Sequence, residues 1–448
     1  MTGRHSHSVL DVAALRGRLG IGLLLAGLVA LTGGGVLGQE IERAPINYSE
    51  ATPKNAVEEL KAKLAAGTAK LEYEPEHGYL RSLLKAFDIP ESSQVLVFSK
   101  TSLQRERISP KTPRGVYFTD DVMIGFCLRG RVIEISAVDD AIGTAFYTLD
   151  QTDEEKPAPQ RQTESCLLCH SSSANRGMPG HLVRSLFVDR RGDPILSAGS
   201  FRTDHASPLA ERWGGWYVTG TSGKQTHLGN TITQGTKRPE NTDNPEGVNV
   251  VDLKDRFTIS FYPTPHSDIV ALMVLEHQTG MLNRLARAAL ETRMALHYER
   301  EMNEALGRPA DEPSESARSR IRGVGDDVVQ YMLLRDEIKL TDPVKGTSTF
   351  TQDFPEVGPR DSKGRSLRDL DLQTRLFRYP CSYLIYSRAF NNLPAEVKDY
   401  VYKRLWEILN GRSDGKEEPQ LASEDRQAIL EILVETKPDL PDYWKASR

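Results

Sequence analysis

The residues of this 448-residue chain whose types and spacing best suit chemistry lie in one short stretch. Cys166 and Cys169 stand three positions apart, and His170 follows the second cysteine directly. Two thiols at this spacing can form thioether bonds to the two vinyl groups of one porphyrin, and the adjacent imidazole can ligate its iron. The C-x-x-C-H pattern therefore predicts one covalent haem c, held by Cys166 and Cys169, with His170 as an axial ligand of the metal.

Two other kinds of site use paired cysteines. A structural zinc site needs a second Cys/His pair at similar spacing, whereas Cys127 and Cys381 are isolated. A thioredoxin-like redox pair is expected in a βαβ context, and no strong amphipathic helix follows Cys169. Both sites remain alternatives to haem attachment. In an oxidising compartment Cys127 and Cys381 could form a disulfide, or they could be two buried free thiols.

The N-terminal residues predict export, in agreement with haem c, which is normally attached outside the cytoplasmic membrane. Arg16 and Arg18 precede an apolar run over residues 19–31, and small residues around Gly38 suit a signal peptidase. We expect residues 1–38 to be a cleaved signal peptide, or else an uncleaved N-terminal anchor. The expected location is the periplasm. No other apolar segment approaches the roughly 20 residues that a membrane span requires.

The composition is that of an ordinary water-soluble chain. The formal net charge is −5 and 38% of the residues are hydrophobic, with basic residues scattered among acidic ones. This pattern is typical of a solvated surface and gives no support to a nucleic-acid partner. The partner that a haem c protein implies is instead a redox protein.

Periodicity divides the chain into a strand-rich part and a helical part. Helical spacing at 54–71 and 78–87 is followed by five short segments rich in β-branched and aromatic residues, which predict a β-meander. These segments are 94–99, 116–118, 122–128, 132–137 and 144–149. A charged loop at 151–161 precedes the cysteines. We expect Thr163 to cap a short helix that holds them, and a hairpin with strands at 181–188 and 194–198 to follow.

The second half of the chain predicts helices. Ser267 and Asp268 can cap a helix that extends to about residue 297. Further helices are expected at 321–334, 367–377, 383–390, 395–410 and 424–436. The fold class is therefore α+β, with a strand-rich region around a single c-type haem and a helical C-terminal half. The expected regions are 1–38, an N-terminal region with the meander at 39–160, a haem c-binding region at 161–265 and a mainly helical region at 266–448.

The second axial ligand of the iron decides the chemistry. A methionine or histidine there gives a six-coordinate electron-transfer centre, whereas an open position admits a small molecule. The candidates are Met178, His181, His205, His227, His266, Met273 and His277. Met178 and His181 lie only eight and eleven residues beyond His170, so they could reach the other face of the porphyrin only if the chain folded sharply. His205 ranks first, ahead of His227 and His277, because His205 and His227 flank Trp213 and Trp216, which could lie over a porphyrin plane. The stretch 201–220 is dense in glycine, aromatic and charged residues, which suit a cofactor-pocket wall. Arg202, Asp204 and Glu211 could orient such a ligand or carry protons.

In its C-x-x-C-H motif the chain resembles c-type cytochromes. The stretches 201–230 and 371–387 are similar to those of large exported single-haem bacterial proteins described only as containing a cytochrome c domain. The resemblance implies haem attachment at Cys166 and Cys169 and ligation by His170, and it implies no particular reaction. The long region before the motif departs from the pattern of small cytochrome c domains.

Three functions compete. The first is electron transfer between periplasmic partners, which a single covalent haem suits. The second is a haem-dependent redox enzyme, peroxidase- or oxidase-like, with an open or displaceable sixth iron position. The large body of the chain favours this enzyme, while the lack of a second C-x-x-C-H argues against a two-haem peroxidase. The third is a sensor or binding module, for which no appended output domain is apparent.

Overall fold

The computed structural model describes residues 40–172, 175–235, 237, 243–310, 312–412 and 419–447. The expected signal peptide or anchor at 1–38 lies outside these residues. Within them, no helix combines the length and the apolar character that crossing a bilayer would demand.

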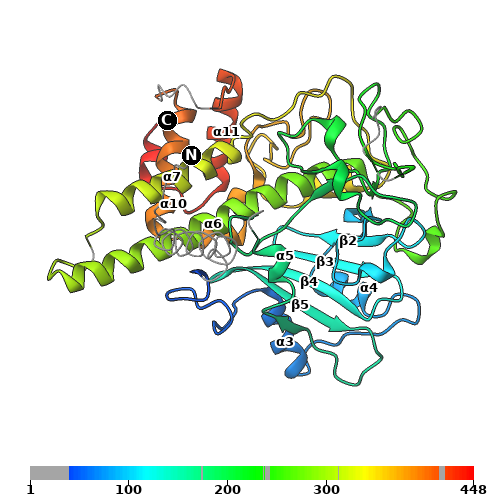
Figure 1. Cartoon of the computed structure of the whole chain (residues 1–448). Coiled ribbons are helices and arrows are strands. Elements are labelled where there is room, and N and C mark those ends of the chain that lie inside the picture. The colour runs from blue at the N-terminus through cyan, green and yellow to red at the C-terminus, as the bar shows by residue number, and fades with distance from the viewer. Residues whose placement is uncertain are drawn as a thin grey trace, which may run out of the picture.

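A seven-stranded antiparallel sheet forms the first half of the described chain (Figure 1). Its spatial order is β6-β5-β4-β3-β2-β1-β9, so the five strands of the predicted meander are consecutive neighbours. The β-meander prediction is confirmed. The strands are β1 Val95–Val97, β2 Arg114–Phe118, β3 Val122–Cys127, β4 Val132–Asp139, β5 Gly143–Asp150, β6 Gln160–Gln162 and β9 Trp216–Tyr217.

Helices cover both faces of this sheet. Successive side chains of a strand point to opposite faces, so neighbouring residues of one strand pack against different helices. In β2, Tyr117 packs with the helices α3 (Ala56–Ala65) and α4 (Leu80–Ala86), which correspond to the two predicted N-terminal helices. Its neighbours Val116 and Phe118 pack on the other face, in the cluster that contains α6 (Ile269–Ala305). The sheet is therefore an interior layer of the molecule.

The helix α6 connects the sheet with the helical second half, as Figure 1 shows. It begins as the sequence predicts, because the Asp268 carboxylate accepts hydrogen bonds from the amides of Val270 and Ala271. The later elements are α7 Glu315–Met332, α8 Phe350–Glu356, α9 Arg388–Asn391, α10 Ala395–Leu409 and α11 Ser423–Thr436. The α+β class is confirmed, with a strand-rich part followed by a helical part.

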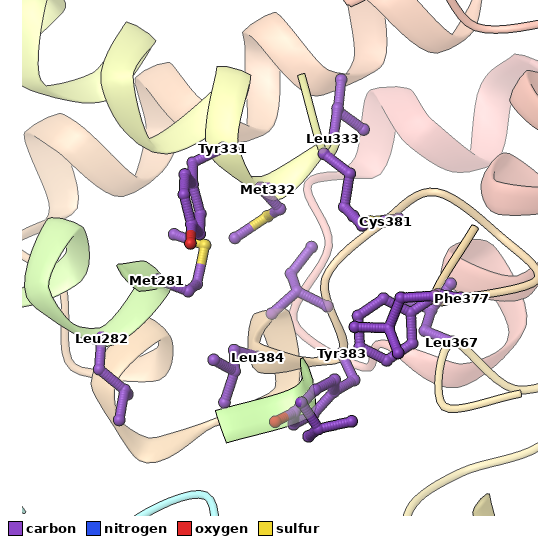
Figure 2. Packing of buried hydrophobic residues seen from close by; sticks show 14 of the residues in the cluster. Met281, Leu282, Tyr331, Met332, Leu333, Leu367, Phe377, Cys381, Tyr383 and Leu384 are labelled. Carbon is purple, nitrogen blue, oxygen red and sulfur yellow. The ribbon is translucent and has the colours of Figure 1, made fainter. Parts of the chain in front are cut away.

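One core cluster joins the two halves. It contains Val95 of β1, Leu282 of α6 and Trp444 near the end of the described chain. Figure 2 shows the side chains of Met281 and Tyr331, from α6 and α7, meeting in this core. The sheet and the helices therefore share their hydrophobic interior.

The prediction of a helix at 367–377 is wrong. Its leucines have helical spacing, but the segment is irregular. The carboxylate of Asp371 accepts hydrogen bonds from the amides of Gln373 and Thr374, and that of Asp369 accepts one from the amide of Ser366. Such local side-chain bonds compete with the helical backbone pattern.

The hairpin predicted after the motif is only partly correct. The first strand exists as β7 (Arg184–Leu186), but its partner is β8 (Ser200–Arg202). The turn predicted at Asp189–Asp193 is present, and Val188 and Pro194 form an antiparallel bridge across it. The return strand predicted at 194–198 does not continue, because Leu196–Ala198 is a 3-10 turn.

Candidate functional site

The two cysteines and His170 lie on one short helical turn, α5 (Leu167–His170), with Cys166 at its N-cap position. The amide of His170 donates to the Cys166 carbonyl at 2.9 Å. Residues three and four positions apart in a helix lie on the same side, so both thiols and the imidazole share one face. The turn begins three residues later than a cap at Thr163 would give, and it has no side-chain cap. Cys169 is exposed and Cys166 is half-buried.

The His170 imidazole is oriented by the backbone. Its Nδ1 lies 2.8 Å from the Gly180 carbonyl oxygen. Because a carbonyl only accepts, Nδ1 must carry the proton, and in the neutral ring the lone pair is then on Nε2. Burial lowers the pKa of His170, an effect that the Gly180 carbonyl opposes. Metal-binding histidines are commonly oriented by such a bond at the far ring nitrogen.

The Gly180 carbonyl is in turn positioned by α6. The Asn283 side chain accepts from the His181 amide and donates to the His181 carbonyl, both at 2.8 Å. A Cβ on Gly180 would lie 2.3 Å from the Asn283 oxygen, so this close approach requires glycine. The side-chain amide of Asn175 also donates to the His170 carbonyl at 3.0 Å. A chain of contacts therefore links α6 to the orientation of the imidazole.

The sheet supplies the surface beneath the turn. The Phe146 ring of β5 lies 4.7 Å from the His170 ring, centroid to centroid. On the same face of the sheet, Glu134 forms a 2.5 Å ion pair with Arg114. Burial, with a further contribution from Glu134, raises the pKa of the Cys166 thiol to about 11. A redox-active cysteine pair depends on a lowered thiol pKa, so this environment disfavours that alternative.

The geometry also disfavours zinc. Within the described residues, no three His, Cys, Asp or Glu side chains converge as the ligands of one metal ion must. Thioether attachment has no such requirement, since the sulfurs bond to the edge of a macrocycle and the imidazole to its centre. The remaining cysteines, Cys127 and Cys381, are buried free thiols whose pKa values burial raises to about 12.

His205, the first-ranked sixth ligand, lies in the interior with both ring nitrogens bonded. Its Nε2 donates to the Arg335 carbonyl at 3.2 Å, and its Nδ1 lies 3.0 Å from Nδ1 of His277. His277 therefore donates from Nδ1, and its Nε2 accepts from the Ser382 hydroxyl at 2.8 Å. Burial lowers the pKa of both histidines, that of His205 to about 4. Ligation by His205 would require the loss of these bonds.

The structure brings two other candidates to the motif. Burial lowers the pKa of His181 to about 3, and the positive charge of a protonated His170 close by contributes to this lowering. Met178 is buried in the cluster against which Leu167 of the turn packs. Their short sequence separation from His170 had placed both below His205. By contrast, Nδ1 of His227 accepts a hydrogen bond from the Gly229 amide, and its ring packs edge-on against Trp213.

A charged cavity of about 440 Å³ adjoins the motif loop, and Asn175 and His181 belong to its lining. Its charged lining residues are Arg176, Arg202, Asp204, Arg284, Arg287 and Asp327. The stretch 201–220, expected as a pocket wall, contributes Arg202 to Asp204. The contribution of α6 and α7 was missed, because Arg284 and Asp327 are distant in sequence and carry no motif.

Comparisons of the chain with protein-family models, curated proteins and solved structures give no match. The function is therefore argued from the residues themselves.

Proposed function

We propose that this protein is an exported single-haem c-type cytochrome that transfers electrons between periplasmic partners. The observation that carries the proposal is the α5 turn, which presents Cys166 and Cys169 on one face while the Gly180 carbonyl holds Nδ1 of His170. The bound haem would supply reversible one-electron chemistry at its iron. Export is supported by the apolar run at 19–31, and the expected partner is a redox protein.

The protein contributes attachment, orientation and access. The two thiols would anchor the group. Burial, which lowers the pKa of His170, favours the neutral ring, and the bond to Gly180 leaves Nε2 as its unprotonated nitrogen. Asn283 and Phe146 restrict the movement of the imidazole. The exposure of Cys169 leaves this face of the turn open to solvent, which favours contact with a partner protein over a fully enclosed centre.

A second candidate is a haem-dependent redox enzyme, peroxidase- or oxidase-like, with an open or displaceable sixth iron position. Two observations favour it. His205 and His277 are bonded to each other rather than directed to the motif, and a charged cavity adjoins the motif loop. The lining residue His181 has an unbonded Nδ1 and a pKa lowered to about 3, which suits a neutral hydrogen-bonding group.

The test is expression of the full chain together with a haem c maturation system, followed by haem staining after denaturing electrophoresis. The wild type should retain haem, and Cys166→Ala/Cys169→Ala should lose it completely. Cys127→Ala is the matched control and should retain it. Absence of stain from the wild type would refute covalent attachment and return attention to thiol or zinc chemistry.

Optical spectra then separate the two candidate functions. An iron that is six-coordinate and indifferent to carbon monoxide supports electron transfer. Ready carbon monoxide uptake by the reduced protein supports the enzyme.

A further inference from the structure

We propose that the cavity beside the motif loop is a binding site for a small oxyanion with at least two negative charges, such as a dicarboxylate or phosphate. Its volume of about 440 Å³ is in the range of small-molecule sites. Four arginines and two aspartates line it, which gives a formal excess of two positive charges. Guanidinium groups match carboxylate and phosphate oxygens in geometry as well as charge.

Two of the four arginines lie on α6 and are held by ion pairs, and the other two are exposed. Arg284 and Arg287 of α6 are fixed by Asp327 of α7, at 3.2 and 3.3 Å, and Arg284 stacks on the Tyr331 ring at 3.8 Å. They are held in place before any ligand arrives, which reduces the entropy cost of binding. Arg176 and Arg202 are exposed lining residues and form the rim of the cavity.

One buried polar group in the lining has no hydrogen-bond partner. It is Nδ1 of His181, in a side chain that is 6% exposed, while Nε2 of the same ring bonds to the Ser136 hydroxyl at 2.9 Å. Buried polar atoms are rarely left unpaired. A ligand oxygen would supply the missing partner. This second observation separates the cavity from an ordinary charged groove.

Two sources of oxyanion share this chemistry. One is a free small molecule, and the other is the propionate pair of a haem attached at Cys166 and Cys169. We commit to the free molecule, because the cavity lining includes neither cysteine nor His170. The inference concerns anion binding alone, so it stands or falls separately from the electron-transfer proposal.

The test is calorimetric titration of the full-length protein with inorganic phosphate and with succinate at low, constant ionic strength. At least one probe should bind, equally well in the haem-containing protein and in Cys166→Ala/Cys169→Ala. Arg176→Gln/Arg202→Gln should weaken binding about tenfold, since it removes two charges from the rim.

Arg107→Gln is the matched control, because Arg107 is exposed and outside the lining, and binding should be unchanged. Urea unfolding of each variant checks that the fold is retained. The proposal is overturned if neither probe binds the wild type, or if the rim variant binds as the wild type does. Binding only by the haem-free form would also overturn it, by assigning the cavity to propionates.

Discussion

Two histidine sites of this molecule use the same side chain in opposite ways. His170, the proposed axial ligand, lies on the short α5 turn, where the Gly180 carbonyl fixes one of its ring nitrogens. His205 lies in the interior, where Arg335 and His277 occupy both of its nitrogens. A metal-binding histidine keeps one ring nitrogen free of hydrogen bonds, whereas both nitrogens of a structural histidine can be hydrogen-bonded.

The largest loss of stability should follow from removal of the buried ion pair beside His205. Arg212 and Glu276 are buried 3.0 Å apart, and Arg212 also donates to the His205 carbonyl. Burial raises the pKa of Glu276 to about 7, against the opposing effect of Arg212. Arg212→Met should lower the free energy of unfolding by about 3–5 kcal/mol, because it leaves a buried carboxylate unpaired.

Urea unfolding measures this loss, and the amount of covalently bound haem should stay the same. The control is Arg322→Met, which removes an exposed ion pair with Glu315 and should leave the free energy of unfolding nearly unchanged. Equal losses in the two variants would show that the interior pair has no special structural role.

The second prediction tests whether His205 is structural. In the folded state its pKa is lowered to about 4, so the unfolded chain takes up a proton first as the pH falls. The stability that His205 contributes is therefore complete above its ordinary pKa of about 6.5 and is lost progressively toward pH 4. His205→Phe should flatten the pH dependence of unfolding by up to about 1.4 kcal/mol per pH unit in that range.

Urea titrations of wild type and variant at pH 7, 6 and 5 provide the comparison. Glu276, with its raised pKa, acts in the opposite sense but is present in both proteins and cancels in the difference. The optical spectrum of the haem-loaded variant should match that of the wild type. A changed spectrum would instead restore His205 as the sixth ligand.

The smallest effect should come from Asn283, which acts on His170 through the backbone. Asn283→Ala removes two hydrogen bonds to the main chain of His181 and should cost about 1–2 kcal/mol. Because the displaced loop carries the Gly180 carbonyl, the reduction midpoint of the haem-loaded protein should shift too. The control is Asn303→Ala, also on α6, which removes one hydrogen bond to the Glu312 carbonyl and should leave that midpoint unchanged.

The sequence predicted β1 to β5 well, because both faces of the sheet are buried there and these strands are consequently rich in β-branched and aromatic residues. It missed the polar edge strand β6. It failed at 367–377, where Asp369 and Asp371 form side-chain bonds that periodicity does not register. The local turn around His170 was readable, since five consecutive residues define it. The arrangement of His205 was not, because its partners His277 and Arg335 are brought to it only by the tertiary fold.

The shared core has a consequence for the order of folding. Val95 and Trp444 belong to the same buried cluster, so packing cannot be completed until nearly the whole chain is present. A protein dominated by such distant contacts is expected to fold slowly. The α5 turn lies before the middle of this sequence and Cys169 is exposed, so its thiol stays accessible to a modifying enzyme both before and after the interior closes.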